Sequence, residues 1–285
     1  MYSILKFELK RAFINRFFVI SVLLGSIISV LQTVEASLPY AFSINFEYDI
    51  YPMSVFNSYI GLSMTSVWTY VFFMIFPLIA SLPYSSSYLS DVKGGYVKTI
   101  FIKTKKIYYF LAKLFAVFLS GGTVVLLPLI LNLLLTALCV PVVIPDISVG
   151  TFPVFGDSFA AGLYYTHPFI YILIYDLIIF ATSGVLACTA LAFSHFIKYK
   201  YVVTLSPFLL FMAISFSSSM LSQKNPLNIS EWILPFQQYQ NLNLFIVIME
   251  LLIIFCISSF IYFFMIKQET KASDHESESS RPRFR

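Results

Sequence analysis

Six stretches of about 20 mostly apolar residues constrain the fold of this chain more than any other feature. A helix needs about 20 such residues to cross about 30 Å of hydrocarbon. The stretches are continuously apolar rather than alternating, which indicates helices and not barrel strands. We therefore predict an all-α polytopic membrane protein with six transmembrane helices. The spans are expected at about residues 17–34, 66–83, 114–138, 169–194, 202–221 and 243–266.

The composition agrees with this class. The 285 residues are 59% hydrophobic and 11% charged, whereas soluble domains have roughly 45–50% apolar and about 25% charged residues. A soluble core cannot absorb this much apolar surface, so the excess is expected to face lipid.

Lys and Arg are distributed unequally between the two sides of this pattern. All but Lys224 of the 18 Lys and Arg residues lie before the first span, in the second-to-third and fourth-to-fifth loops, or after the last span. Short loops rich in Lys and Arg stay in the cytoplasm. We therefore predict a multi-pass protein of the cell membrane with both the N- and C-termini cytoplasmic, as an even number of spans requires.

The two ends of the chain are predicted to differ. Apolar side chains such as Leu5, Leu9 and Phe13 recur at helical steps over residues 2–16, which favours an amphipathic helix in the cytoplasmic interface. A solvated flank with stop-transfer charges is the alternative. The last residues lack an apolar run and are predicted to be disordered. The predicted regions are thus 1–16, 17–266 and 267–285.

No residue pattern typical of an enzyme or a metal site is present. The chain has no GxxxxGK[ST], HExxH or GxSxG motif, so we expect no catalytic residues, no cofactor bound by this chain and no nucleotide hydrolysis by it. Cys139, Cys188 and Cys256 are scattered and are interpreted as apolar filler. The positive charge follows the membrane topology, so no nucleic-acid partner is expected.

Two carboxyl groups fall inside predicted spans. Asp176 lies in the fourth span and Glu250 in the sixth, and no span contains Lys or Arg to pair with them. A charge at mid-span costs about 2.5–3.5 kcal/mol. Either they are polar residues of a translocation path, or they are protonated and bonded to nearby Ser, Thr or Tyr, with Ser215 as one candidate. The pair Gly121-Gly122 is expected to permit close helix contact.

The loop between the second and third spans, residues 84–113, carries the most informative pattern. An acidic residue is followed by glycine, an apolar stretch, a short basic turn and then Ala-Lys at the start of the third span. This loop resembles that of ABC type-2 permeases, the membrane subunits of many bacterial ABC exporters. The residues that the resemblance assigns to ATPase coupling are Asp91, Gly94, Gly95, Lys103, Lys105, Lys106 and Lys113.

The resemblance implies a function and partners. The loop would form a coupling helix in a groove of a separate ABC ATPase subunit, and that subunit would bind ATP and Mg²⁺. Two permease subunits would pair as a homo- or heterodimer and export a peptide, lipid-like or drug-like substrate. The lysines are also explained by topological anchoring, and the basic face suits membrane lipids as well as an acidic partner.

Other functions remain open on the sequence alone. An ion-coupled secondary transporter would use Asp176 and Glu250 as coupling carboxyls, although no inverted repeat is visible. A membrane enzyme is disfavoured by the missing catalytic set. A non-transporting membrane immunity or assembly factor would bind a partner without moving a substrate.

Overall fold

All the secondary structure described for this protein is helical. The computed structural model describes residues 2–43, 53–146, 153–156, 158–221, 229–234, 236 and 244–279, and within these ranges no strand occurs. This confirms the predicted all-α class. The elements are α1 (Tyr2–Phe13), α2 (Arg16–Gln32), the π-helix η1 (Thr33–Ser37), α3 (Leu38–Ser43), α4 (Val55–Ser58), α5 (Val67–Ser81), α6 (Ser87–Lys93), α7 (Tyr96–Lys103), α8 (Lys106–Cys139), α9 (Ala161–Thr166), α10 (Pro168–Phe193), α11 (Lys200–Leu221), α12 (Ile229–Trp232) and α13 (Leu244–Ser279).

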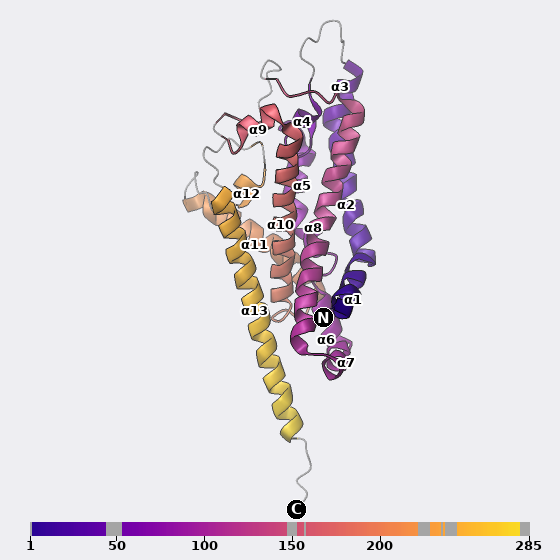
Figure 1. Cartoon of the computed structure of the whole chain (residues 1–285), viewed down its shortest axis with the longest axis vertical. Coiled ribbons are helices and arrows are strands. Elements are labelled where there is room, and N and C mark those ends of the chain that lie inside the picture. Colours follow the sequence, from indigo (N-terminus) through magenta and orange to yellow (C-terminus); the bar gives the residue numbers. More distant parts are fainter. Residues whose placement is uncertain are drawn as a thin grey trace, which may run out of the picture.

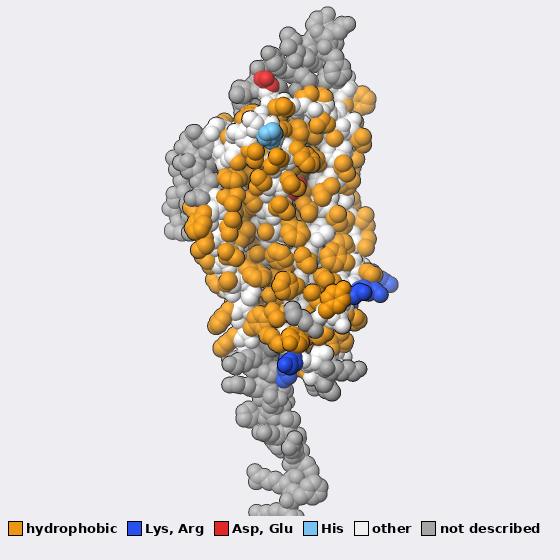
Figure 2. All heavy atoms as spheres, viewed as in Figure 1, with side chains coloured by type: hydrophobic (Ala, Val, Ile, Leu, Met, Phe, Trp, Pro, Cys, Tyr) orange, Lys and Arg blue, Asp and Glu red, His pale blue; other side chains and the backbone are white. Residues whose placement is uncertain are grey.

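The long helices form an elongated bundle. Figure 1 shows α1, α6 and α7 at one end, here called the N-terminal end of the bundle, and α3, α4 and α9 at the other. Hydrophobic side chains cover the side of the bundle that Figure 2 shows, while Lys and Arg gather near its N-terminal end. Leu23 and Ile27 on α2, and Leu173 and Leu177 on α10, are among the exposed apolar residues. Such a surface suits hydrocarbon rather than water.

Within the described residues, five helices are long and apolar enough to cross a membrane. They indicate a multi-pass membrane protein and correspond to the first, third, fourth, fifth and sixth predicted spans. Their spanning segments are Arg16–Ser43, Lys106–Cys139, Pro168–Phe193, Lys200–Ser217 and Leu244–Met265.

The second predicted span, 66–83, corresponds to a shorter helix. α5 has 15 residues, so it is about 22 Å long at 1.5 Å per residue and is shorter than a span requires. It nevertheless packs against α2, α8, α10 and α11, and its Phe72, Phe76 and Ile79 side chains are buried. The structure therefore supports five candidate spans by length, with α5 as a short central helix among them.

At both ends of the chain the helices end at positions other than those expected from the sequence. The helix predicted over residues 2–16 is α1, which ends at Phe13, and the side chain of Asn15 caps α2 by accepting from Phe17 N at 3.2 Å. At the other end α13 continues to Ser279, so 267–279 is helical where disorder was expected. This segment contains Lys, Glu, Gln and Ala but no Gly or Pro, a composition that favours a helix. Residues 280–285 lie outside the described residues.

Glycines permit a close crossing between α8 and α10. A Cβ on Gly122 would lie 2.8 Å from Phe180 O, and a Cβ on Gly184 would lie 2.8 Å from Phe118 O. Each glycine thus accommodates the phenylalanine of the opposite helix, and the two rings meet edge to face with centroids 5.9 Å apart. Gly121 similarly faces Ala187. The packing role predicted for the Gly121-Gly122 pair is confirmed.

A buried amide ties a non-helical segment to the bundle. Asn132 of α8 donates to Gln32 Oε1 at 2.6 Å, and its Oδ1 accepts from Ile60 N at 2.8 Å. Gln32 in turn donates to Ser58 O at 2.9 Å. These bonds satisfy one backbone group at the end of α4 and one in the segment after it, and leaving such groups without partners in apolar surroundings is costly.

Gly122→Ala is predicted to destabilise the protein by about 1–3 kcal/mol, the usual cost of forcing extra volume into a packed core. The added Cβ meets a backbone oxygen of α10 that cannot move without separating the helices. Unfolding in detergent micelles measures the change. Gly162→Ala is the matched control, because nothing lies within 4 Å of a Cβ there. Equal unfolding midpoints for the two variants would contradict the packing role.

Candidate functional site

A cluster of buried charges joins three helices at the N-terminal end of the bundle. Its central group is the carboxylate of Asp91 on α6, whose side chain is only 3% exposed. Around it lie side chains of α1, α8 and the turn before α6. We define the Asp91 cluster as Glu8, Arg11, Tyr84, Asp91, Tyr109 and Lys113.

Asp91 accepts hydrogen bonds from two helices at once. Arg11 of α1 binds it in a bidentate manner, with Nη2 2.6 Å from Oδ1 and Nη1 3.2 Å from Oδ2. From α8, Lys113 Nζ donates to Oδ2 at 2.5 Å and the Tyr109 hydroxyl donates to Oδ2 at 2.7 Å. Bidentate Arg–carboxylate pairs fix orientation as well as distance, so the position of α6 is defined relative to both α1 and α8.

Glu8 balances the second positive charge. Its Oε2 accepts from the Tyr84 hydroxyl at 2.6 Å and lies 3.4 Å from Lys113 Nζ, while Oε1 accepts from Arg11 at 3.3 Å. Lys113 is fully buried and also donates to Ser87 Oγ at 3.2 Å. Two carboxylates therefore face two cations, and the cluster as a whole is close to neutral.

Aromatic rings enclose the cations. Lys113 Nζ lies 5.0 Å from the ring centroid of Tyr84 and 5.1 Å from that of Tyr109, and the Arg11 guanidinium lies 4.9 Å from that of Tyr96. Cation–π contacts of this kind contribute about 0.5–2 kcal/mol, more when water is excluded. The rings also keep water out, which strengthens the ion pairs inside.

Contacts within the Asp91 cluster lower the pKa of Asp91 and raise that of Arg11, and the pKa of Tyr84 is also raised. Burial alone would raise the pKa of Asp91, but the Arg11 hydrogen bonds and the Lys113 charge outweigh it and lower that pKa below the ordinary 3.8. Burial would lower the pKa of Arg11, but the hydrogen bond to Asp91 reverses this and raises it. Burial, reinforced by Glu8, raises the pKa of Tyr84. At neutral pH Asp91 is therefore ionised, Arg11 is charged and Tyr84 retains its proton for Glu8.

The structure brings together only part of the predicted coupling set. Asp91 and Lys113 form a direct ion pair inside the cluster. Gly94 and Gly95 separate α6 from α7, and Gly95 has a φ of +71°, in the left-handed region that favours glycine. Beyond α7, which ends at Lys103, Lys105 is exposed and Lys106 opens α8 with its Nζ 5.2 Å from the Phe101 ring centroid.

Sequence reasoning missed Glu8, Arg11, Tyr84 and Tyr109. The helical wheel of residues 2–16 predicted an amphipathic helix in the cytoplasmic interface, with Glu8 outside its apolar face, yet Glu8 is fully buried in the bundle while Tyr2 is 78% exposed. The spacing of Glu8 and Arg11, three residues apart on one helix face, was the available signal. It became meaningful only when the fold placed Asp91 and Lys113 against that face.

The two carboxyls inside the spans have separate partners. The Tyr59 hydroxyl donates to Asp176 Oδ1 at 2.6 Å, and Trp232 Nε1 donates to Glu250 Oε2 at 3.0 Å. Tyr59 follows α4 and Trp232 belongs to α12, so both partners come from outside the candidate spans. The bonded-carboxyl interpretation therefore has specific support, with Tyr59 and Trp232 in the place where a serine of α11 was considered.

The Asp91 cluster links α1, α6 and α8 through hydrogen bonds and ion pairs. Its groups are paired with one another, and in the described part of the chain no three His, Cys, Asp or Glu residues are placed to hold a metal ion. No family model, curated protein or solved structure matches this chain. The site geometry and the sequence pattern are consequently the basis for proposing a function.

Asp91→Asn is predicted to destabilise the protein by about 3–5 kcal/mol, because Arg11 and Lys113 would keep buried charges without their shared carboxylate. Unfolding in detergent measures this loss. Lys6→Gln, which removes a charge at an exposed position of α1, is the control and should change stability little.

The pH dependence of unfolding provides a second readout for the same variant. The pKa of Asp91 is lowered in the folded state. Its ionised carboxylate therefore contributes fully to the free energy of unfolding above about pH 3.8, and this contribution is lost as the pH falls through the folded-state pKa. Lowering the pH should therefore reduce the difference in free energy of unfolding between wild type and Asp91→Asn. A difference that stays constant down to about pH 3 would show that the Asp91 charge is not what stabilises the cluster.

Proposed function

We propose that this chain is the permease subunit of an ABC transporter that exports a peptide, lipid-like or drug-like substrate. ATP would be hydrolysed by a separate ATPase subunit, which would bind the nucleotide and Mg²⁺. The single observation that carries the proposal is the Asp91 cluster. It attaches the α6–α7 segment, in which the resemblance to ABC type-2 permeases lies, to α1 and α8 through paired charges.

A coupling loop must transmit displacement, and the Asp91 cluster supplies the necessary attachment. Buried ion pairs contribute little net stability, but they define one arrangement and are costly to separate. A push on α7 would pass through α6 to Arg11, and hence to α1 and the α2 helix that follows it. Through Lys113 and Tyr109 it would reach α8, which continues from Lys106 to Cys139.

α7 itself is positioned as a docking element would be. It lies at the N-terminal end of the bundle (Figure 1), with Phe101 packed against Tyr109 and Phe110 of α8 at ring-centroid distances of 6.2 and 5.6 Å. One side is thus held by the bundle, while Thr99 is exposed. The exposed Lys105 beyond α7 suits an acidic surface on the ATPase subunit.

The proposed topology has both termini in the cytoplasm and α5 as the second of six spans. The charge distribution supports it, because α1, α6 and α7 carry most of the Lys and Arg of the first half of the chain and lie at the same end of the bundle. α5 would be the second span although it has only 15 residues, with α2, α8, α10 and α11 packed around it. Two such subunits, identical or different, would pair around one pathway.

Gly95→Pro is predicted to abolish ATP-driven transport while leaving membrane insertion intact. Proline holds φ near −65° and has no N–H, whereas Gly95 has φ +71° and donates to Val92 O at 3.2 Å. Nothing lies within 4 Å of a Cβ added at Gly95, so the change acts through the backbone and would redirect α7. Transport by the chain and its co-purified ATPase subunit, reconstituted in liposomes, is the measurement.

Gly95→Asn is the control for this variant, because asparagine tolerates the left-handed region and should preserve most of the transport. Substrate movement in liposomes that contain the wild-type chain and no ATPase subunit would overturn the proposal. An ATPase subunit that binds without any transport would instead favour an immunity or assembly role.

An ion-coupled secondary transporter is the second candidate, supported by the burial of Asp176 and Glu250 within α10 and α13. Asp176→Asn discriminates between the two functions. The amide oxygen still accepts the Tyr59 hydrogen bond, so the fold should persist. An ATP-driven permease is predicted to retain transport in this variant, whereas loss of transport driven by a proton gradient would favour the secondary transporter.

A further inference from the structure

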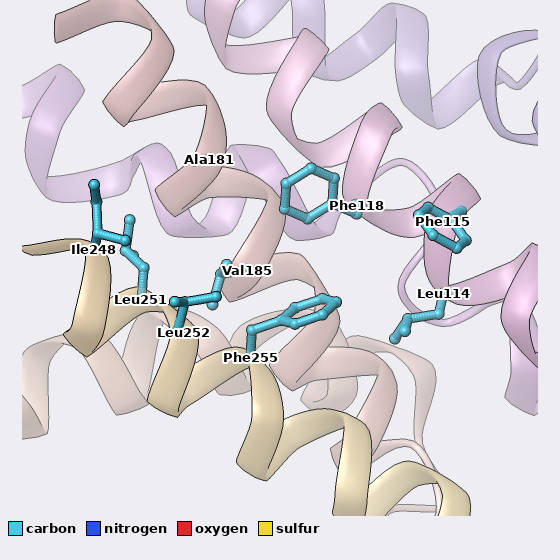
Figure 3. A pocket seen from close by; sticks show the side chains of 9 residues that line it. All are labelled: Leu114, Phe115, Phe118, Ala181, Val185, Ile248, Leu251, Leu252 and Phe255. Atoms are coloured by element: carbon cyan, nitrogen blue, oxygen red, sulfur yellow. The ribbon is translucent and has the colours of Figure 1, made fainter.

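An apolar groove with a volume of about 370 Å³ lies between α8, α10 and α13 (Figure 3). α8 contributes Leu114, Phe115 and Phe118, and α10 contributes Ala181 and Val185. The remaining lining comes from residues 248–255 of α13. Every lining side chain is hydrocarbon, so the groove offers no group that could bind a polar ligand.

The groove exists because two helices flank α10 without closing on each other. α8 and α13 both pack along α10, and the rings of Phe118 and Phe255 meet edge to face with centroids 6.0 Å apart. Only 17% of the most apolar segment of α13 is buried in the bundle, against 56% for the corresponding segments of α8 and α10. α13 therefore lies at the edge of the bundle with most of its spanning segment exposed.

The groove opens toward the side of the bundle. Leu114 and Val185 are buried at its base, while Phe115 and Leu252 at its rim are 49% and 50% exposed. Its three helices are all candidate membrane spans. Among the lining residues, Ala181 lies near the middle of the candidate span Pro168–Phe193. The opening therefore faces the hydrocarbon region of the membrane rather than its surface.

We propose that this groove is a binding site for an acyl chain of a membrane phospholipid. A cavity of about 150 Å³ lined by Leu, Ile and Phe accepts a benzene molecule, so 370 Å³ leaves room for a substantial length of hydrocarbon chain. A purely apolar lining at this depth excludes a headgroup and selects the chain.

A helix from a second copy fits the groove less well. Helices associate closely in membranes where small residues line the contact, whereas the rim here carries the bulky and exposed Phe115, Ile248 and Leu252. A narrow chain can pass between these side chains, but a helix would rest on top of them. The inference depends on the membrane-spanning helices and not on the proposed transport function.

Photolabelling of the full chain tests the site. The wild-type protein is reconstituted in phosphatidylcholine vesicles that contain phosphatidylcholine with a diazirine in one acyl chain, and labelled peptides are identified by mass spectrometry. Labelling of segments 114–118 and 248–255 is expected to exceed that of the spanning segment of α11. Uniform labelling of all exposed helix faces, as expected for bulk lipid alone, would overturn the proposal without requiring any variant.

A filled groove gives the second comparison. Ala181→Phe places a ring among the lining residues and is expected to abolish the excess labelling of the two groove segments. Ala213→Phe makes the same change at an exposed position of α11 and should preserve it. Unchanged labelling in Ala181→Phe would overturn the proposal, and so would cross-links between two copies through the groove segments in place of lipid labels.

Discussion

The carboxylate of Asp91 is the point on which the N-terminal end of the bundle depends. Removing an ion from water costs several kcal/mol, and that cost is offset only where partners and hydrogen bonds are complete. Asp91 has both, from Arg11, Lys113 and Tyr109. Each cation also contacts Glu8. Loss of any one of the four charged side chains would therefore leave the cluster with an uncompensated charge. As a result α1 is held in one arrangement with α6 and α8, although Arg11 and Asp91 are 80 positions apart in sequence.

Polar side chains within the candidate spans also need hydrogen-bond partners, and they obtain them differently from Asp91. There, polar side chains bond to segments outside the spans instead of to opposite charges. Asp176 holds Tyr59, and Glu250 holds Trp232 of α12. In apolar surroundings an unsatisfied polar group costs several kcal/mol. These bonds therefore keep the short segments beyond the helices in contact with α10 and α13, while the groove beside α13 has no polar group that must be satisfied.

A feature could be predicted from the sequence where neighbouring residues determine it, and could not where contacts between distant helices do. Hydropathy located the five long helices, because the cost of exposing or burying apolar side chains is read from local sequence. It also indicated a span at residues 66–83, where α5 has 15 residues and buries Phe72, Phe76 and Ile79 against neighbouring helices. The Gly121-Gly122 pair indicated close packing, but the reciprocal fit of Gly122 with Phe180 and Gly184 with Phe118 needed the crossing itself.

The sequence by itself determined the helical class, the approximate helix positions and the concentration of cations in the loops, since these depend on composition and on spacing along one segment. It also drew attention to Asp91 and Lys113. Only the tertiary structure decided that these two side chains pair with each other and with Glu8 and Arg11. Residues 80 positions apart form this contact, and a contact over that separation depends on how helices pack, which no local pattern specifies.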